Sequence, residues 1–166
     1  IPHVQSVSIG FWIRAGSLYE TVHENGISHL LEHMLFKGTS KRSAKQIAAE
    51  IDDLGGELNA CTSKECTCVY VKVLGEHAAV AIDIISDMIL NSNFDDAELQ
   101  KERMIILDEI NLYDDSAEDL IYDRLSEVMF KGHALGRPIL GSVDSINGID
   151  RDLMLSYFKR HYNAEN

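Results

Sequence analysis

Residues 26–39 of this 166-residue chain read GISHLLEHMLFKGT, and the stretch has the pattern of an amphipathic helix. At 100° per residue, His29 and His33 lie one turn apart on one face, with Glu32 on the same side. The opposite side is apolar and consists of Leu30, Leu31, Met34 and Leu35. Two neutral imidazoles so placed can bind one zinc ion, and the carboxylate between them can reach a water on the metal. This order, H-x-x-E-H, is the inverted zinc-peptidase motif. The alternative is two histidines that share a helix edge by coincidence.

The helix of residues 26–37 is one of several elements that the sequence predicts. We expect Asn25 to be its N-cap and Gly38 to end it. Alternating apolar residues predict strands over residues 4–14, 57–61 and 67–74, with a polar turn at 62–64. Further helices are predicted over residues 43–54, 77–90, 95–113, 117–130 and 151–162. Because helices and strands are segregated, we expect a single α+β domain over residues 1–166, with a mainly antiparallel sheet packed against several helices.

Two glutamates lie within the apolar arc of the helix predicted over residues 95–113. Glu102 and Glu109 share that arc with Leu99, Ile105, Ile106, Ile110, Leu112 and Tyr113. A buried carboxylate needs a metal, a cation or a hydrogen-bond donor, because it costs several kcal/mol without one. A catalytic zinc site has three protein ligands and a water, so Glu109 or Glu102 can complete the set that His29 and His33 begin. An ion pair with a Lys or Arg of another helix is the alternative.

Charge and composition exclude several classes of partner. The chain has 27 acidic and 15 basic residues, a formal net charge of −12, which repels phosphate, so we expect no nucleic-acid partner. No apolar run approaches the roughly 18 residues that cross a bilayer, and the first residues lack the layout of a signal peptide, so we expect no membrane partner. Cys61, Cys66 and Cys68 suit neither a disulfide framework nor a zinc knuckle, which favours a reducing compartment.

The helix motif resembles the signature of the M16 family of zinc peptidases, which includes pitrilysin and the mitochondrial processing peptidase. Glu109 lies 76 positions after His33, the separation at which this family carries its third ligand, and Glu102 stands where the family has another glutamate. The likeness is greatest to processing-peptidase-like proteins of bacteria and to the catalytic β subunit of the mitochondrial enzyme. It continues in SVSIGFWIRAGSLYE (6–20), LGGELNACTSKECT (54–67), KERMIILDEI (101–110) and GHALGRPILG (132–141). The departures are Asp108, Ala134 and Ala164, none of which is an expected ligand.

The resemblance implies a zinc metalloendopeptidase that hydrolyses peptide bonds in extended peptides or presequence-like segments. His29, His33 and Glu109 would hold one Zn²⁺ per active site. Glu32 would be the general base that takes a proton from the zinc-activated water. Glu102 would accept a hydrogen bond from a ligand imidazole and so fix its tautomer.

The resemblance also implies where the substrate binds. In the family the peptide lies extended along a sheet edge beside the zinc, which corresponds here to Leu58, Asn59 and Ala60. For Asn59 the alternative is a residue that only satisfies a turn. Both interpretations can hold together, because main-chain pairing does not depend on the side chain.

Family members are longer than this chain, so we expect residues 1–166 to be incomplete at both ends. A second M16-type domain of the same protein would close over the substrate, and residues 1–166 alone would be weakly active or inactive. Exposed sheet edges would favour a homodimer. The expected location is the bacterial cytoplasm or, as the alternative, the mitochondrial matrix. Two other functions stay open: a non-catalytic family member that binds peptides or partners, and a structural zinc domain without chemistry.

Overall fold

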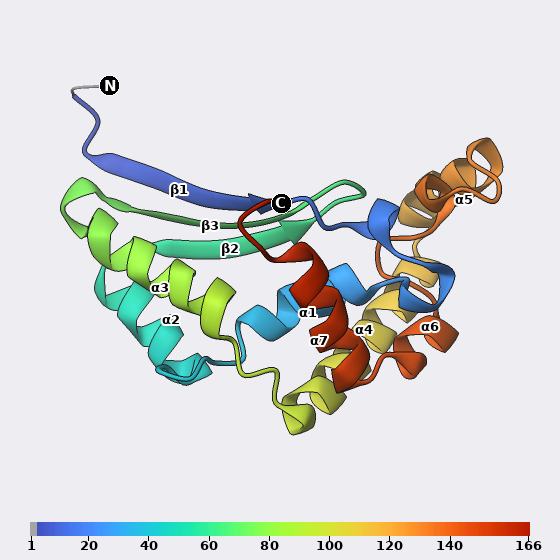
Figure 1. Cartoon of the computed structure of the whole chain (residues 1–166). Coiled ribbons are helices and arrows are strands. Elements are labelled where there is room, and N and C mark those ends of the chain that lie inside the picture. The colour runs from blue at the N-terminus through green and yellow to red at the C-terminus, as the bar shows by residue number, and fades with distance from the viewer. Residues whose placement is uncertain (1–2) are drawn as a thin grey trace.

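The computed structural model describes residues 3–166 and contains one three-stranded antiparallel sheet (Figure 1). The strands are β1 (Ser6–Ile13), β2 (Glu57–Thr62) and β3 (Thr67–Leu74), in the order β1-β3-β2. Thr67 of β3 pairs with Ile13 of β1 on one side and with Thr62 of β2 on the other. Within residues 3–166, β1 and β2 are therefore the two edges of the sheet.

Helices cover one face of this sheet and extend beyond one end of it (Figure 1). They are α1 (Ile27–Leu35), α2 (Ala44–Asp53), α3 (Ala78–Asn91), α4 (Asp96–Asp115), α5 (Ala117–Met129), α6 (Val143–Gly148) and α7 (Arg151–His161). Helix α3 packs on β3 and β1, α2 packs on β2, and α1 contacts β2, β3, α4 and α7. The α+β class with segregated helices and strands is confirmed. None of the helices within residues 3–166 combines the length and the apolar character that a bilayer crossing needs.

The core lies between the helix-covered face of the sheet and helices α1 and α3. Its members from these elements are all buried: Val69, Val71 and Val73 of β3, Ile84, Ile85 and Met88 of α3, and Leu30, Leu31, Met34 and Leu35 of α1. Full burial of one such side chain contributes about 1.5–3 kcal/mol. The apolar side of α1 predicted from its periodicity is therefore confirmed, and its burial leaves the opposite side of the helix to the two histidines.

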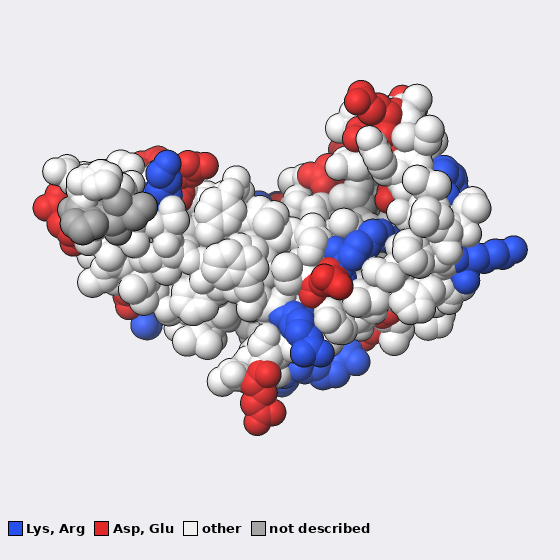
Figure 2. Space-filling view, turned by 90° about the horizontal axis from the view of Figure 1, so that it is seen from above, with Lys and Arg blue, Asp and Glu red and all other residues white. Residues whose placement is uncertain are grey.

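The other face of the sheet differs from the helix-covered one. No helix within residues 3–166 lies over it (Figure 1). Viewed from above, the surface over the sheet consists mostly of uncharged side chains (Figure 2). Trp12 of β1 is 67% exposed. The surplus of acidic residues is thus not spread over this face.

The start of α1 differs from the prediction. Its N-cap is Gly26, not Asn25, with a φ of 93°. A Cβ at Gly26 would lie 2.6 Å from the carbonyl oxygen of Leu140, so only glycine fits there. The buried Glu20 carboxylate accepts hydrogen bonds from the backbone N–H groups of Gly26 (2.9 Å) and Ser28 (3.0 Å) and from the Asn25 amide (2.9 Å). A distant carboxylate thus satisfies N–H groups that a helix start leaves without partners.

Other differences concern exposure and a turn. In α4, Leu99, Ile106 and Ile110 are buried as predicted, but three members of the predicted arc are exposed: Ile105 (44%), Leu112 (69%) and Tyr113 (47%). Leu112 and Tyr113 belong to the C-terminal part of α4, which leaves the core together with α5 (Figure 1). Ile105 lies in the middle of the helix, at the edge of the predicted arc. Thr62, expected in a turn, is the last residue of β2. Helix α6 was not predicted, whereas the other element boundaries agree to within two residues.

Candidate metal centre

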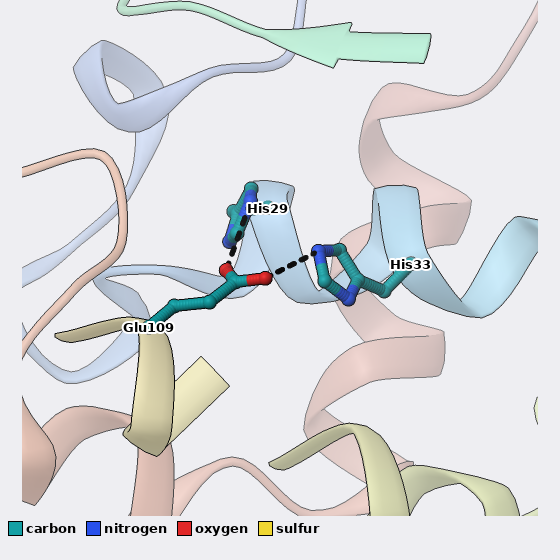
Figure 3. A group of neighbouring side chains, drawn as sticks. All are labelled: His29, His33 and Glu109. Atoms are coloured by element: carbon teal, nitrogen blue, oxygen red, sulfur yellow. Dashed lines mark ion pairs between the residues drawn. The ribbon is translucent and has the colours of Figure 1, made fainter. Parts of the chain in front are cut away.

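Three side chains converge where α1 faces α4. His29 and His33 come from α1 and Glu109 from α4, and one ligand atom of each lies within 4.8 Å of the others (Figure 3). The Nε2 atoms of His29 and His33 are each 3.9 Å from a different oxygen of Glu109. Ligand atoms about 2 Å from a tetrahedral zinc lie about 3.4 Å from one another, so small side-chain movements would close this set around an ion. Two imidazoles and one carboxylate also match the ligand types that zinc takes, with a fourth position left open.

The protonation of His29 suits a metal ligand. Burial, reinforced by the neighbouring His33, lowers the pKa of His29 to about 4. The ring is therefore neutral at pH 7 and keeps a lone pair, which is the form that binds metals. Its Nδ1 atom is buried and has no hydrogen-bond partner within residues 3–166. Packing, rather than a hydrogen bond through Nδ1, holds this ring among those residues.

His33 is held differently, through Glu102. The Glu102 Oε2 atom lies 3.0 Å from Nδ1 of His33, and its Oε1 atom lies 2.7 Å from the Lys37 ammonium. The Glu102 residue is only 3% exposed. A carboxylate on Nδ1 keeps the ring proton there, so Nε2 of His33 presents its lone pair toward Glu109. The glutamate thus has both partners considered from the sequence, a histidine and a cation.

Lys37 is a member of the site that the sequence interpretation missed. It follows His33 by four residues, so the i, i+4 spacing along the helix direction was a signal that could have placed it near the same face. Lys37 is needed there because Glu102 is a buried charge, which one imidazole alone would not compensate.

Glu32 lies beside the cluster with its carboxylate turned to β2. Burial raises its pKa, although a hydrogen bond from Thr62 and the proximity of His33 oppose that shift. The Thr62 hydroxyl donates to Glu32 Oε2 over 2.5 Å. A carboxylate with a raised pKa exchanges protons closer to neutral pH, which suits a general base. Thr62 was also missed, because its separation of 30 residues from Glu32 gives no periodic signal.

The residues expected to bind substrate lie on the free edge of β2. Ser63 N–H donates to the Cys66 carbonyl, so these two residues form a hydrogen-bonded pair between β2 and β3. In an antiparallel ladder such pairs recur at every second residue, which makes Asn59 and Tyr70 a hydrogen-bonded pair as well. The backbone groups of Asn59 therefore point to β3, whereas those of Leu58 and Ala60 point to the free edge. The Ala60 N–H is bonded to the amide oxygen of Asn59 (2.8 Å), so Asn59 makes the local bond that the alternative interpretation expected.

Known proteins with similar sequences are peptidases by name. Residues 1–143 match the family model of the insulinases, peptidase family M16. The uncharacterized zinc protease YmxG of Bacillus subtilis is 47% identical over 164 residues, which cover 99% of this chain and 40% of that protein. Subunit beta of the mitochondrial-processing peptidase of Lentinula edodes is 43% identical over 164 residues, which cover 99% of this chain and 35% of the subunit.

Solved structures share the fold at lower identity. A protease from Helicobacter pylori has a TM-score of 0.94 at 22% identity, over 98% of this chain and 39% of its own. A domain from Pseudomonas fluorescens, described as a peptidase M16 inactive domain, has a TM-score of 0.87 at 16% identity, over 94% of this chain and 38% of its own. These identities show the fold alone. The chain spans 40% or less of the length of each of these four relatives.

Proposed function

This chain belongs to the insulinase family of peptidases, family M16, and on that premise we propose that it is the metal-bearing part of a zinc metalloendopeptidase acting on extended peptides. The observation that carries the proposal is the convergence of His29, His33 and Glu109 within 4.8 Å, with Glu32 in the same helix turn as His33. A binding module without chemistry has no need of a carboxylate base beside an incomplete set of metal ligands.

In the proposed reaction, His29, His33 and Glu109 would hold one Zn²⁺. Zinc in such a site lowers the pKa of a bound water to about 7 and polarises a carbonyl. Glu32, whose pKa burial raises, takes the proton of the attacking water and returns it to the leaving amine. Glu102 keeps the proton of His33 on Nδ1 and so keeps Nε2 available to the metal.

The peptide is proposed to lie along β2. The backbone groups of Leu58 and Ala60 on the free edge would pair with an extended peptide, and Asn59 would release the Ala60 N–H that it holds. Backbone pairing reads little of the peptide's sequence, which fits cleavage of varied extended segments.

The chain spans only 40% of the length of its relative from Bacillus subtilis, so the peptidase activity is proposed for a longer protein of which residues 1–166 are a part. We propose that a second M16-type domain of the same protein completes the substrate site, and that residues 1–166 alone have little or no activity. We also propose a bacterial cytoplasmic location, with the mitochondrial matrix as the alternative, and pairing of free sheet edges as the route to a homodimer.

The test uses the full-length protein and a set of unstructured peptides. Zinc content, cleavage, loss of cleavage with chelator and recovery with added zinc are measured for the wild type and for two variants. Glu32→Gln should keep zinc and lose cleavage, whereas Asp108→Asn, a matched loss of charge on the exposed side of α4, should keep both. Chelator-resistant cleavage, or full activity of Glu32→Gln, would refute the proposed mechanism.

A non-catalytic peptide-binding role is the second candidate, and one observation favours considering it. The Pseudomonas fluorescens domain described as inactive has nearly the same fold, so the fold by itself does not imply catalysis. A binding protein would retain peptides in the presence of zinc and release them uncleaved. Product analysis of the full-length protein by mass spectrometry distinguishes the two.

A further inference from the structure

The hydroxyl of Thr62 makes the one hydrogen bond that the Glu32 carboxylate has within residues 3–166. Thr62 Oγ1 donates to Oε2 of Glu32 over 2.5 Å, and no donor in that part of the chain reaches Oε1. Thr62 is half-buried at the end of β2. Its neighbours Cys61 and Ser63 have their backbone groups turned to β3, and their pairing holds this part of the strand in place. The bond therefore joins a rigid position on the sheet to a side chain of α1.

Counting hydroxyl protons shows that Thr62 has to be the donor of this bond. Thr67 Oγ1 lies 3.4 Å from Thr62 Oγ1, but its single proton goes to the backbone carbonyl of Ala15 over 2.8 Å. Thr67 is fully buried, which fixes that arrangement. Because each threonine hydroxyl has one proton, the proton of Thr62 is available for Glu32, and an ionised carboxylate can only accept.

We propose that Thr62 is a positioning residue that selects Oε1 of Glu32 as the atom that takes the proton during peptide hydrolysis. The inference rests on the proposed function, because Glu32 is the base of that reaction. The hydrogen bond from Thr62 engages one lone pair of Oε2 and makes that oxygen the less basic of the two, whereas Oε1 accepts no hydrogen bond within residues 3–166, so the incoming proton goes to Oε1. The same hydrogen bond fixes the rotation of the carboxylate plane relative to the metal ligands.

The position of Thr62 also links the base to the substrate strand. Thr62 is two residues from Ala60, whose backbone groups point to the free edge of β2. One short strand thus carries both the edge proposed to pair with the peptide and the hydroxyl that holds the base. A peptide bound in register on β2 therefore lies at a set distance from Glu32.

The test compares Thr62→Val and Thr62→Ser in the full-length zinc-loaded protein, with Thr67→Val as the matched control. Valine keeps the shape and removes the hydroxyl, whereas serine keeps the hydroxyl. A base misplaced by about 1 Å costs up to about 100-fold, so kcat of Thr62→Val should fall about 10- to 100-fold with KM within about threefold of the wild type. Thr62→Ser and Thr67→Val should keep kcat within about threefold.

Several results would overturn the proposal. They are a kcat of Thr62→Val within threefold of the wild type, an equal loss in Thr62→Ser, an equal loss in Thr67→Val, or a change confined to KM. A reduced zinc content that accounts for the loss would do so as well.

A second measurement does not depend on peptidase activity. In metal-free crystals of the full-length protein, the Glu32 carboxylate should have one orientation in the wild type and Thr62→Ser, and a rotated or divided one in Thr62→Val. An unchanged orientation in Thr62→Val would refute the positioning role. Failure of the proposed function would give a different result, namely peptide cleavage that continues in the presence of chelator or in the Glu32→Gln variant.

Discussion

Replacing Glu102 with Gln should switch His33 to the wrong tautomer. Glu102 accepts from Nδ1 of His33 (3.0 Å) with one oxygen and from the Lys37 ammonium (2.7 Å) with the other. A glutamine has one acceptor and one donor end, and an ammonium can only donate, so the amide oxygen will face Lys37. The amide NH₂ then faces Nδ1, which has to accept, and the ring proton moves to Nε2. That nitrogen is the one that faces Glu109.

The size of the effect follows from the bond that zinc binding has to break. To bind the metal through Nε2, His33 must return its proton to Nδ1 and lose the hydrogen bond from the amide. Leaving such buried groups unsatisfied costs about 1–3 kcal/mol. At 1.4 kcal/mol for each tenfold change, Kd for zinc should rise about 5- to 140-fold, which spans the roughly 10- to 100-fold loss typical of lost outer partners of ligand histidines.

The assay is zinc competition against a chromophoric chelator at pH 7 with the full-length protein. Asp108→Asn removes the same charge from the exposed side of α4 and should leave Kd within about twofold. In Lys37→Met with Glu102→Gln, the amide is free to turn its oxygen to Nδ1, so the double variant should recover most of the loss. Equal Kd values for Glu102→Gln and the wild type, or no recovery in the double variant, would refute the tautomer argument.

Three further predictions follow from other contacts. Glu32→Gln should keep stoichiometric zinc and lower kcat at least about 100-fold, as measured by metal analysis and peptide cleavage. Gly26→Ala should lower the urea midpoint of the unfolding transition that reports on this part of the chain, because the new Cβ would lie 2.6 Å from the Leu140 carbonyl oxygen and the φ of residue 26 is 93°. Gly148 has open space around it, so Gly148→Ala should leave that midpoint nearly unchanged. Asp87 of α3 is buried and accepts hydrogen bonds from Thr39, Arg42 and Asn91. Burial alone would raise the pKa of Asp87, but these hydrogen bonds hold it below its usual value. The contribution of Asp87 to stability is therefore complete above about pH 4 and is lost as pH falls further, so Asp87→Asn should show a smaller loss of unfolding free energy between pH 5 and pH 2.5.

The helix motif was predictable because all of its information is local. Periodicity places His29 and His33 on one side of α1, and the buried leucines opposite them confirm that orientation. The expectation that Glu109 would join the two histidines followed from a carboxylate within an apolar arc together with the spacing of the family motif. The three side chains do lie together. Whether they bind zinc in this chain stays a prediction.

Partners brought together by loops were not predictable. The Glu20 carboxylate that satisfies the start of α1 and the Thr62 hydroxyl on Glu32 come from segments with no periodic relation to their partners. The exposed end of α4 was mistaken for core, because an apolar arc does not reveal how far along a helix the neighbouring elements reach. Such facts depend on packing between elements.

The sequence by itself therefore determined the α+β class, the bounds of the strands and of every α-helix but α6 to within two residues, and the set of side chains that could hold a metal, since helical and strand periodicities are properties of neighbouring residues. Helical periodicity left both Glu102 and Glu109 as candidates for the third ligand, and only the spacing of the family motif favoured Glu109. In the structure Glu109 faces both imidazoles and Glu102 contacts His33. The contact of Glu102 with Lys37 was decided by the tertiary structure alone. Both glutamates lie in the same arc of α4, two turns apart. Only the position at which α4 crosses α1 decides which carboxylate reaches the ligands, and that position is set by the packing of their apolar sides.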